Sequence, residues 1–262
     1  MSGSAPSPHA PILKVENLTM SFGGLTAVRD LSFQVLPGEI VAMIGPNGAG
    51  KTTAFNVLTA TYRAAAGSMT FDGRDLGRLS PHEVTEAGLV RTFQNLRLFP
   101  DMTVLDNVKV GRYCRTRAGV FQALTRLPRT RREERKIEEE ALASLEFVGI
   151  LHRADELAKS LPYGDQKLLE IARALATTPR MMLLDEPAAG LNSGESAELV
   201  RLVRKIRADG VTIMLIEHDM KVVMTISDRI VVLDHGSQIC AGTPEEVRQN
   251  RRVIDAYLGK AG

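Results

Sequence analysis

One eight-residue motif restricts what this chain can fold into more than any other feature of its sequence. The run Gly45-Pro46-Asn47-Gly48-Ala49-Gly50-Lys51-Thr52 fits G-x-x-x-x-G-K-[ST], and it stands between the apolar segment 40–44 and a helical pattern over 51–60. A polyphosphate is bound by converging backbone N–H groups, which glycines permit, and the start of a helix adds its positive dipole end. The motif therefore predicts a buried strand, a phosphate-binding loop and a helix in direct succession.

Length and composition limit the remaining possibilities. The chain has 262 residues, 33 Lys plus Arg against 31 Asp plus Glu, and 44% hydrophobic residues. This indicates one large globular domain, or a core with an added subdomain, and it excludes a disordered chain. A net charge of +2 gives no support for a nucleic-acid partner.

Neither a metal centre formed by cysteines nor a membrane span is indicated. Cys114 and Cys240 match no metal-ligand spacing, which favours two reduced thiols in a cytosolic protein. No apolar run approaches the ~20 residues of a membrane helix, so we expect any membrane role to be that of a subunit docked on another protein. Residues 1–11, with three prolines and no signal-peptide pattern, are predicted to form a disordered tail.

The elements around the motif predict a parallel sheet. Residues 12–35 read as antiparallel strands joined at Gly23-Gly24, and the apolar runs 181–184 and 211–216 read as buried strands. An amphipathic helix between those two runs begins near Asn192 and ends at Gly210. Such alternation of strand and helix is typical of an α/β fold.

The chain ends in a predicted hairpin and helix. The hairpin joins Ile230 to Leu233 with Gln238 to Ala241 through His235-Gly236, and one final helix begins at Pro244.

A helical insert is predicted over 96–178, between core segments 12–95 and 179–262. It holds a basic stretch followed by Glu138-Glu139-Glu140. We favour a solvated face with i,i+4 ion pairs for this stretch, and the alternative is a patch for a membrane surface or nucleic acid. The basic residues are Arg126, Arg129, Arg131, Arg132, Arg135 and Lys136.

Two side chains of the loop have predicted roles at a nucleotide. Lys51 supplies a charge to the β- and γ-phosphates, and the Thr52 hydroxyl is a ligand for Mg²⁺. Asp185, at the end of a buried strand, is expected to hold Mg²⁺ through water, while Glu186 polarises the water that attacks the γ-phosphate.

A histidine ends the neighbouring strand. His218 follows Ile216-Glu217 and is expected at the same sheet edge, where it contacts the γ-phosphate or braces Glu186.

Taken together and in this order, these segments resemble the nucleotide-binding subunit of an ATP-binding cassette (ABC) transporter from about Leu13 to Gly259. The resemblance implies a phosphate-loop NTPase (RecA-like) core with an N-terminal antiparallel β subdomain and an inserted helical subdomain. It also implies ATP and Mg²⁺ as cofactors.

The resemblance assigns further roles to residues outside the loop. Phe22, with Val28 beside it, matches the aromatic that stacks on adenine, and Thr53 joins the loop residues that bind phosphate. Gln94 matches the glutamine that touches Mg²⁺. The segment 96–100 after it matches the place where a membrane subunit docks.

The segment that matches the family signature departs from the usual Leu-Ser-Gly-Gly-Gln. Here Leu161-Pro162-Tyr163-Gly164-Asp165-Gln166 precedes a helix, so a proline without hydroxyl or N–H replaces the serine that contacts ATP across the dimer. Asp165 places a carboxylate near polyphosphate. Gly164 and the N–H groups from Asp165 onward can still bind phosphate.

The resemblance implies a two-fold dimer that encloses two ATP molecules. The loop of each chain meets the signature of the other, and hydrolysis releases the pair. Ala189-Gly190-Leu191-Asn192 resembles the loop that crosses this interface. The second ATPase subunit is either another copy of this chain or a related one.

Several segments are similar to the larger ATPase subunit of bacterial branched-chain amino-acid importers. They include Val90 to Gln94, the Tyr163 signature and the terminal Ala256-Tyr257-Leu258-Gly259. The expected partners are integral membrane permease subunits and, indirectly, a periplasmic or extracellular solute-binding protein. The expected location is the cytoplasmic face of the inner membrane, as a peripheral subunit.

Two other classes stay open from sequence. A soluble cassette ATPase that acts on ribosomes or DNA is favoured only by the basic stretch, and such proteins generally carry two cassettes in one chain. A phosphate-loop kinase would not need Gln94, the signature and His218 in this order.

Overall fold

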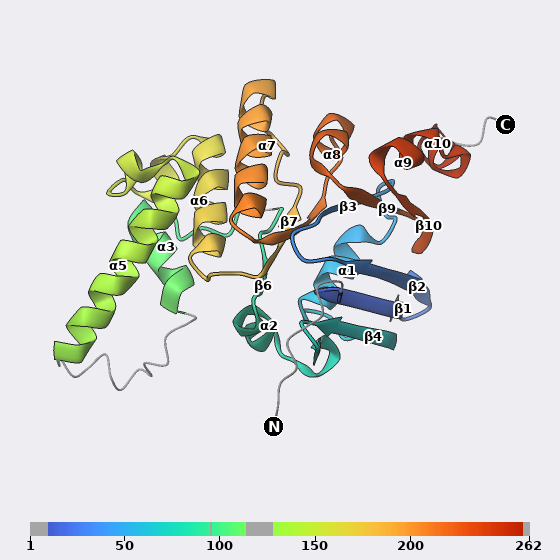
Figure 1. Ribbon diagram of the computed structural model, residues 1–262, viewed down its shortest axis with the longest axis horizontal. Helices are drawn as coiled ribbons and strands as arrows, with labels where there is room; N and C mark the ends of the chain where they lie inside the picture. The colour runs from blue at the N-terminus through green and yellow to red at the C-terminus, as the bar shows by residue number, and fades with distance from the viewer. Residues whose placement is uncertain (1–9, 95, 114–127, 259–262) are drawn as a thin grey trace.

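A six-stranded sheet organises the molecule in the computed structural model, which describes residues 10–94, 96–113 and 128–258 (Figure 1). Its strand order is β10-β9-β3-β8-β7-β6, and the strands from β9 to β6 run parallel. The predicted tail lies almost entirely outside the described residues, as do Cys114 and Arg126. The strands are β3 (Ile40–Ile44), β6 (Leu89–Arg91), β7 (Met181–Asp185), β8 (Thr212–Ile216), β9 (Arg229–Asp234) and β10 (Ser237–Gly242).

Alternate residues of the central strands enter two separate cores. Ile40, Ala42 and Ile44 of β3 belong to one cluster, whereas Val41 and Met43 belong to the other. The same alternation holds in β7, β8 and β9. The continuous apolar runs in the sequence therefore reflect strands covered on both faces, as predicted.

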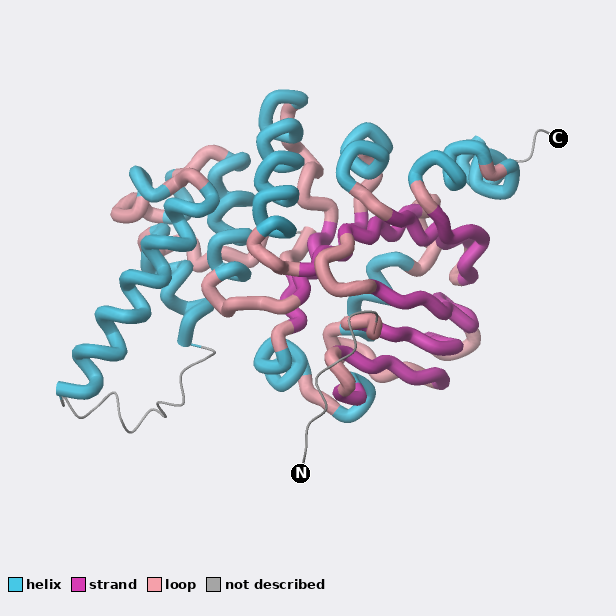
Figure 2. The backbone as a smooth tube through the Cα atoms, viewed as in Figure 1, coloured by secondary structure: helices cyan, strands magenta, loops and turns pink. Residues whose placement is uncertain are grey.

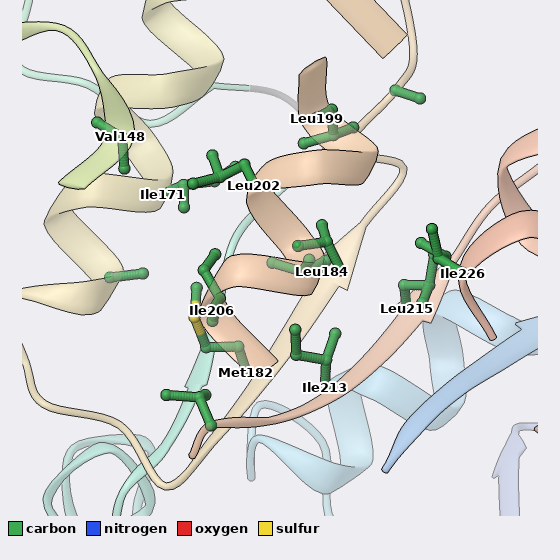
Figure 3. Packing of buried hydrophobic residues seen from close by; sticks show 14 of the residues in the cluster. Val148, Ile171, Met182, Leu184, Leu199, Leu202, Ile206, Ile213, Leu215 and Ile226 are labelled. Carbon is green, nitrogen blue, oxygen red and sulfur yellow. The ribbon is translucent and has the colours of Figure 1, made fainter. Parts of the chain in front are cut away.

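The first core lies under the helices that follow the strands. Ile206 and Leu202 of α7 (Ser193–Ala208) pack over Met182 and Leu184, and Ile171 of α6 (Tyr163–Leu175) lies beside Leu202 (Figure 3). Also over this face are α8 (Met220–Ile226), α9 (Pro244–Gln249) and α10 (Arg251–Leu258).

The second core lies between the sheet and the N-terminal strands. A four-stranded antiparallel sheet of order β2-β1-β4-β5 covers it together with α1 (Lys51–Leu58) (Figures 1 and 2). Its strands are β1 (Leu13–Phe22), β2 (Leu25–Val35), β4 (Ala66–Phe71) and β5 (Arg74–Asp75). The antiparallel pairing of β1 with β2 confirms the predicted hairpin.

Helices α3 (Val104–Tyr113), α5 (Pro128–Val148) and α6 form an arm beside the sheet. Val104, Ala141 and Leu145 of this arm belong to the same core as β7 and β8, so one hydrophobic cluster crosses the subdomain boundary predicted at 178. The arm is therefore packed firmly on the core. The division into core and helical subdomain remains a prediction.

The structure corrects one expectation about elements and adds two further elements. The C-terminal helix predicted from Pro244 is two helices, since the chain leaves helical geometry at Asn250. Strand β6 and helix α2 (Pro81–Ala87), which the sequence analysis left unassigned, supply one edge of the sheet and its connection. No helix in the described part of the chain combines the length and apolar character needed to cross a bilayer.

Candidate functional site

The phosphate-binding loop joins β3 to α1 and bends through three glycines. Gly45, Gly48 and Gly50 have φ values of 152°, 78° and 99°. A Cβ on Gly50 would lie 2.4 Å from the Ala27 carbonyl oxygen, and one on Gly45 would lie 2.1 Å from that of Leu233. These two glycines are therefore required by space as well as by backbone conformation.

Lys51 lies in the concave side of this loop. Its Nζ donates to the carbonyl oxygens of Gly45 at 2.7 Å and Pro46 at 2.9 Å, and the residue is 6% exposed. Burial lowers the pKa of Lys51, and the negative charges of Glu186 and Asp185 oppose that shift. The predicted loop, lysine and acidic strand end thus come together at one sheet edge.

Asp185 ends β7 in an ion pair that the sequence analysis missed. Its Oδ2 accepts from Nη2 of Arg91 at 2.5 Å, and the two side chains are 2% and 6% exposed. Arg91 ends the neighbouring strand β6 and also donates to Asn56 of α1. The other oxygen of Asp185, Oδ1, is buried without a hydrogen-bond partner among the described residues. Arg91 therefore fixes one oxygen of Asp185 and leaves the other for a further ligand.

Glu186 is held by His218, which was expected to brace it, and by Gln94, for which an Mg²⁺ contact was expected. Gln94 Nε2 donates to Glu186 Oε2 at 2.8 Å, and His218 Nε2 lies 2.8 Å from Glu186 Oε1. The backbone of Glu186 has a positive φ of 49°, which turns the chain out of β7. Gln94, Glu186 and His218 thus form a cluster next to the phosphate loop.

Phe22 and Val28 differ in their access to a ligand. Phe22 ends β1, is 43% exposed and packs edge to face on Tyr62 with ring centroids 5.2 Å apart. Val28 is fully buried, and a Cβ on Gly50 would lie 3.3 Å from its Cγ2. Phe22 is thus accessible to a ligand and Val28 lies beneath the loop, while an adenine contact of either residue stays a prediction.

The signature segment lies against the loop after Glu186 in the same chain. Tyr163, the first residue of α6, is 44% exposed, and a Cβ on Gly190 would come within 2.8 Å of its ring. Lys167, one turn on, donates to the Glu186 carbonyl oxygen at 3.3 Å. The signature thus borders the far end of the 187–192 loop.

The polar residues of the signature are paired within the arm. Asp165 Oδ2 lies 2.7 Å from Nε of Arg153, and Gln166 Nε2 donates to the Leu161 carbonyl oxygen at 2.9 Å. The Leu161 side chain is 4% exposed. The Arg153 guanidinium therefore offsets the negative charge that Asp165 brings to the signature, and the exposed residues of the signature are Pro162 and Tyr163.

Arg91, Arg153 and Lys167 were not assigned as site residues from sequence. Arg91 carried a usable signal, because it precedes Gln94 on a short apolar segment and adjacent parallel strands end at the same edge. Arg153 carried none, since its partner is twelve residues away across a 3₁₀ turn.

The fold and this site define a class: an ATPase with a phosphate-binding loop on a mainly parallel sheet and a signature on a helical arm. A family model described as "ABC transporter" matches residues 28–189, and one described as "Branched-chain amino acid ATP-binding cassette transporter" matches residues 237–262. The chain belongs to the ABC transporter family and is an ATP-binding subunit that hydrolyses ATP.

Individual relatives and solved structures agree with this family assignment. The chain is 48% identical over 252 residues to the high-affinity branched-chain amino acid transport ATP-binding proteins LivG of Salmonella typhimurium and BraF of Pseudomonas aeruginosa, covering 96% of this chain and 99% of each relative. A crystal structure of a nucleotide-free ATP-binding cassette from an ABC transporter superposes with a TM-score of 0.84, at 32% identity, covering 96% of this chain and 100% of that one. A dimeric post-hydrolysis cassette with ADP and phosphate gives 0.75 at 25% identity, with coverages of 88% and 98%.

Proposed function

We propose that this chain drives a membrane importer for branched-chain or related amino acids by hydrolysing ATP between two ATPase subunits. The observation that carries the proposed chemistry is the Glu186 carboxylate, held by Gln94 and His218 beside the phosphate loop. The proposed solute class is supported by the named relatives and by the match of the C-terminal residues 237–262.

In this proposal the loop residues 45–53 bind the phosphates of ATP, and Phe22 stacks on its adenine. Glu186 accepts a hydrogen bond, and later a proton, from the attacking water. The water oxygen bonds to the γ-phosphorus while the bond from that phosphorus to the β–γ bridging oxygen breaks, which gives ADP and phosphate. His218 fixes the orientation of Glu186 through their 2.8 Å contact. Lys51 stabilises the charge on the transferred group.

The residues present fit a magnesium ion carried in with the nucleotide. Asp185 Oδ1 is a buried oxygen in need of a partner, and Thr52, the second residue of α1, is exposed. No group of three or more His, Cys, Asp or Glu is gathered in the described ranges, which suits an ion held mainly by phosphate and water. Thr52, Gln94 and Asp185 would hold it, and it would neutralise charge on the β- and γ-phosphates.

The position of the signature supports a nucleotide shared by two chains. Tyr163 and Gly164 border the 187–192 loop on the side of the arm, whereas Phe22 and Lys51 belong to the N-terminal half of the core. A two-fold pair places the signature of each chain over the phosphate loop of the other. The dimeric cassette among the structural relatives supports this arrangement.

A groove between the sheet edge and the arm is the proposed docking site for a permease subunit. It has a volume of about 340 Å³, and Arg97 and Phe99 of the predicted docking segment 96–100 line it. A helix of the permease that inserts here would be coupled to the bound nucleotide through the contact between Gln94 and Glu186. Its lining includes Val90, Phe93, Arg97, Phe99, Glu170 and Arg173.

This assembly locates the chain on the cytoplasmic face of the inner membrane, as a peripheral subunit. ATP hydrolysis by this chain drives transport through the permease subunits. Those subunits and the solute-binding protein select the amino acid. Within the basic stretch, Lys136 lies within ion-pair distance of Glu140 four residues on, which is the pairing expected of a solvated helix face.

The test is uptake of labelled leucine by cells that carry the importer genes but lack the chromosomal copy of this chain. Restoring the wild-type chain should restore uptake, and Lys51→Ala should not, at equal protein level. Affinity purification from solubilised membranes should recover polytopic permease subunits with the wild type. Recovery with ribosomes or DNA, together with unchanged leucine uptake in the deletion, would contradict the proposal.

A further inference from the structure

A second buried carboxylate lies directly behind Glu186 and has no place in the proposed mechanism. Glu217 follows the last residue of β8 and is 3% exposed. Buried glutamates are rare unless their oxygens are satisfied, and this one accepts three backbone N–H bonds. It therefore has a specific structural task at this edge of the sheet.

The three donors come from two different segments of the site. Oε1 accepts from Ala188 N at 2.6 Å, in the loop that follows Glu186. Oε2 accepts from His218 N at 3.0 Å and from Asp219 N at 3.3 Å. One side chain thus joins the backbone of the 187–192 loop to the backbone of His218 and Asp219.

Both joined segments end at functional positions. The His218 side chain contacts Glu186, and two residues after Ala188 the loop reaches Gly190, against the Tyr163 ring of the signature. Lys167 of the signature helix also bonds the Glu186 carbonyl oxygen. Glu217 therefore connects the two segments, the His218 segment and the 187–192 loop, that contact or follow the proposed water-polarising residue Glu186.

The carboxylate of Glu217 suits the three amide donors that face it. Because all three partners donate, both oxygens must accept, which is what an ionised carboxylate does. Burial raises the pKa of Glu217, the three amide bonds oppose that shift, and the nearby charge of Glu186 adds to it. A carboxylate kept here despite burial and a neighbouring like charge indicates that the three bonds matter to the site.

We propose that Glu217 is a positioning residue that fastens the 187–192 interface loop to the His218 segment, so that both take up their places around Glu186 together. The inference rests on the roles proposed above for Glu186 and His218. It predicts that loss of one acceptor oxygen lowers the rate of hydrolysis without weakening the binding of ATP by the phosphate loop.

The test variant is Glu217→Gln, which keeps the size of the side chain and replaces one acceptor by an NH₂ group facing an N–H donor. The matched control is Glu39→Gln. Glu39 is also mostly buried, accepts from the Leu36 backbone N–H at 2.8 Å and pairs with Arg229, but it precedes β3 at the opposite end of the sheet. Both variants are compared with wild type for ATPase kinetics, melting temperature and ATP affinity by calorimetry.

We expect Glu217→Gln to lower kcat by about tenfold or more while the Kd for ATP changes by less than about threefold. Glu39→Gln should lose a similar amount of thermal stability and keep its kcat. Equal losses of kcat in both variants, or a parallel loss of ATP affinity in Glu217→Gln, would overturn the proposal.

A second measurement separates positioning from general destabilisation. Glu217→Gln is combined with His218→Ala, and its effect on kcat should shrink by at least about threefold in that background, because part of its action passes through the histidine. The same factor in both backgrounds would contradict the proposal. If His218→Ala alone keeps wild-type kcat, the proposed role of the histidine fails instead, so the two failures are distinguishable.

Discussion

Gly50 shows how one residue decides whether the phosphate loop can form. It caps α1 with φ 99°, and its α-carbon faces the Ala27 carbonyl of the N-terminal sheet. Gly149, after α5, has a closely similar φ of 88° but open space around it. Alanine substitutions at Gly50 and Gly149 therefore separate the free-energy cost of a left-handed backbone from that of a steric clash.

We predict that Gly149→Ala lowers the free energy of unfolding by about 1 kcal/mol, the cost of a left-handed alanine. Gly50→Ala should lose about 2 kcal/mol more, because the Ala27 backbone must move, and it should also lose ATP affinity. Chemical denaturation and calorimetry measure the two effects. Similar stability losses in both variants, with ATP binding intact, would show that the close approach at Gly50 is unimportant.

At this scale the sequence was a good guide to residue types and a poor one to their partners. The motif placed Lys51, Asp185 and Glu186 at one edge, because a loop and strand ends of a parallel sheet must meet there. The partners that depend on packing between distant segments, such as Arg91 for Asp185 and Arg153 for Asp165, came only from the structure. The burial of Val28 could not be predicted from the sequence either, since a valine in a strand can face either side of the sheet.

The signature helix α6 carries two features whose effects can be measured. Pro162 is its N-cap and cannot accept a hydrogen bond through its side chain, while Glu170 on its inner face is 4% exposed and accepts from the Phe93 backbone N–H at 3.0 Å. The first concerns how the helix begins, and the second how it is tied to the segment that follows β6.

We predict that Pro162→Ser keeps or raises the ATPase rate. A serine supplies both an N-cap acceptor, worth about 1 kcal/mol, and the hydroxyl that the family uses toward ATP, while loss of the proline restraint costs up to about 1 kcal/mol. Stability should therefore change by less than about 1 kcal/mol in urea denaturation. A severe loss of ATPase activity at unchanged stability would show that the proline is adapted to this site.

Glu170 leads to a prediction about pH. Burial raises its pKa above that of an exposed glutamate, and the Phe93 N–H opposes the shift. The folded state thus binds the proton more tightly than the unfolded state, so this group's stabilising contribution is full below the unfolded pKa and is lost as pH rises through the folded pKa.

The melting temperature of Glu170→Gln, which does not titrate at this position, should therefore rise relative to wild type between pH 4 and pH 8. Glu83→Gln, an exposed capping glutamate whose pKa is lowered by its bonds to Ser80, should show the opposite trend. Scanning calorimetry of wild type and the two variants at several pH values measures these differences in melting temperature. A difference between wild type and Glu170→Gln that stays constant with pH would contradict the assigned cause.

Element by element, the strongly patterned segments were predicted and the weakly patterned ones were missed. Strands β3, β7 and β8 are buried on both faces and read as unbroken apolar runs, whereas β6 has only three residues and β4 begins with Ala-Gly-Ser. The last helix was predicted as one element because Asn250 is compatible with a helix. There the chain turns so that α9 can pack on β10 and β9.

Over the whole molecule, the arrangement separates the two halves of the proposed nucleotide site. The phosphate loop and Phe22 belong to the core, and the signature borders the 187–192 loop on the arm. The proposed function therefore takes a closed pair of chains as the hydrolytic unit, because each chain supplies the half of the site that the other lacks. In that proposal, release of phosphate removes the contact that closes the pair.

The most direct measurement of this claim is sedimentation of the Glu186→Gln variant with ATP and Mg²⁺. Without the water-polarising carboxylate, hydrolysis should fall by about 100-fold or more while the loop still binds ATP, so the account predicts a stable dimer that holds two ATP molecules. Adding Lys51→Ala to this variant should leave it monomeric. A Glu186→Gln chain that binds ATP tightly and yet sediments as a monomer would contradict the account.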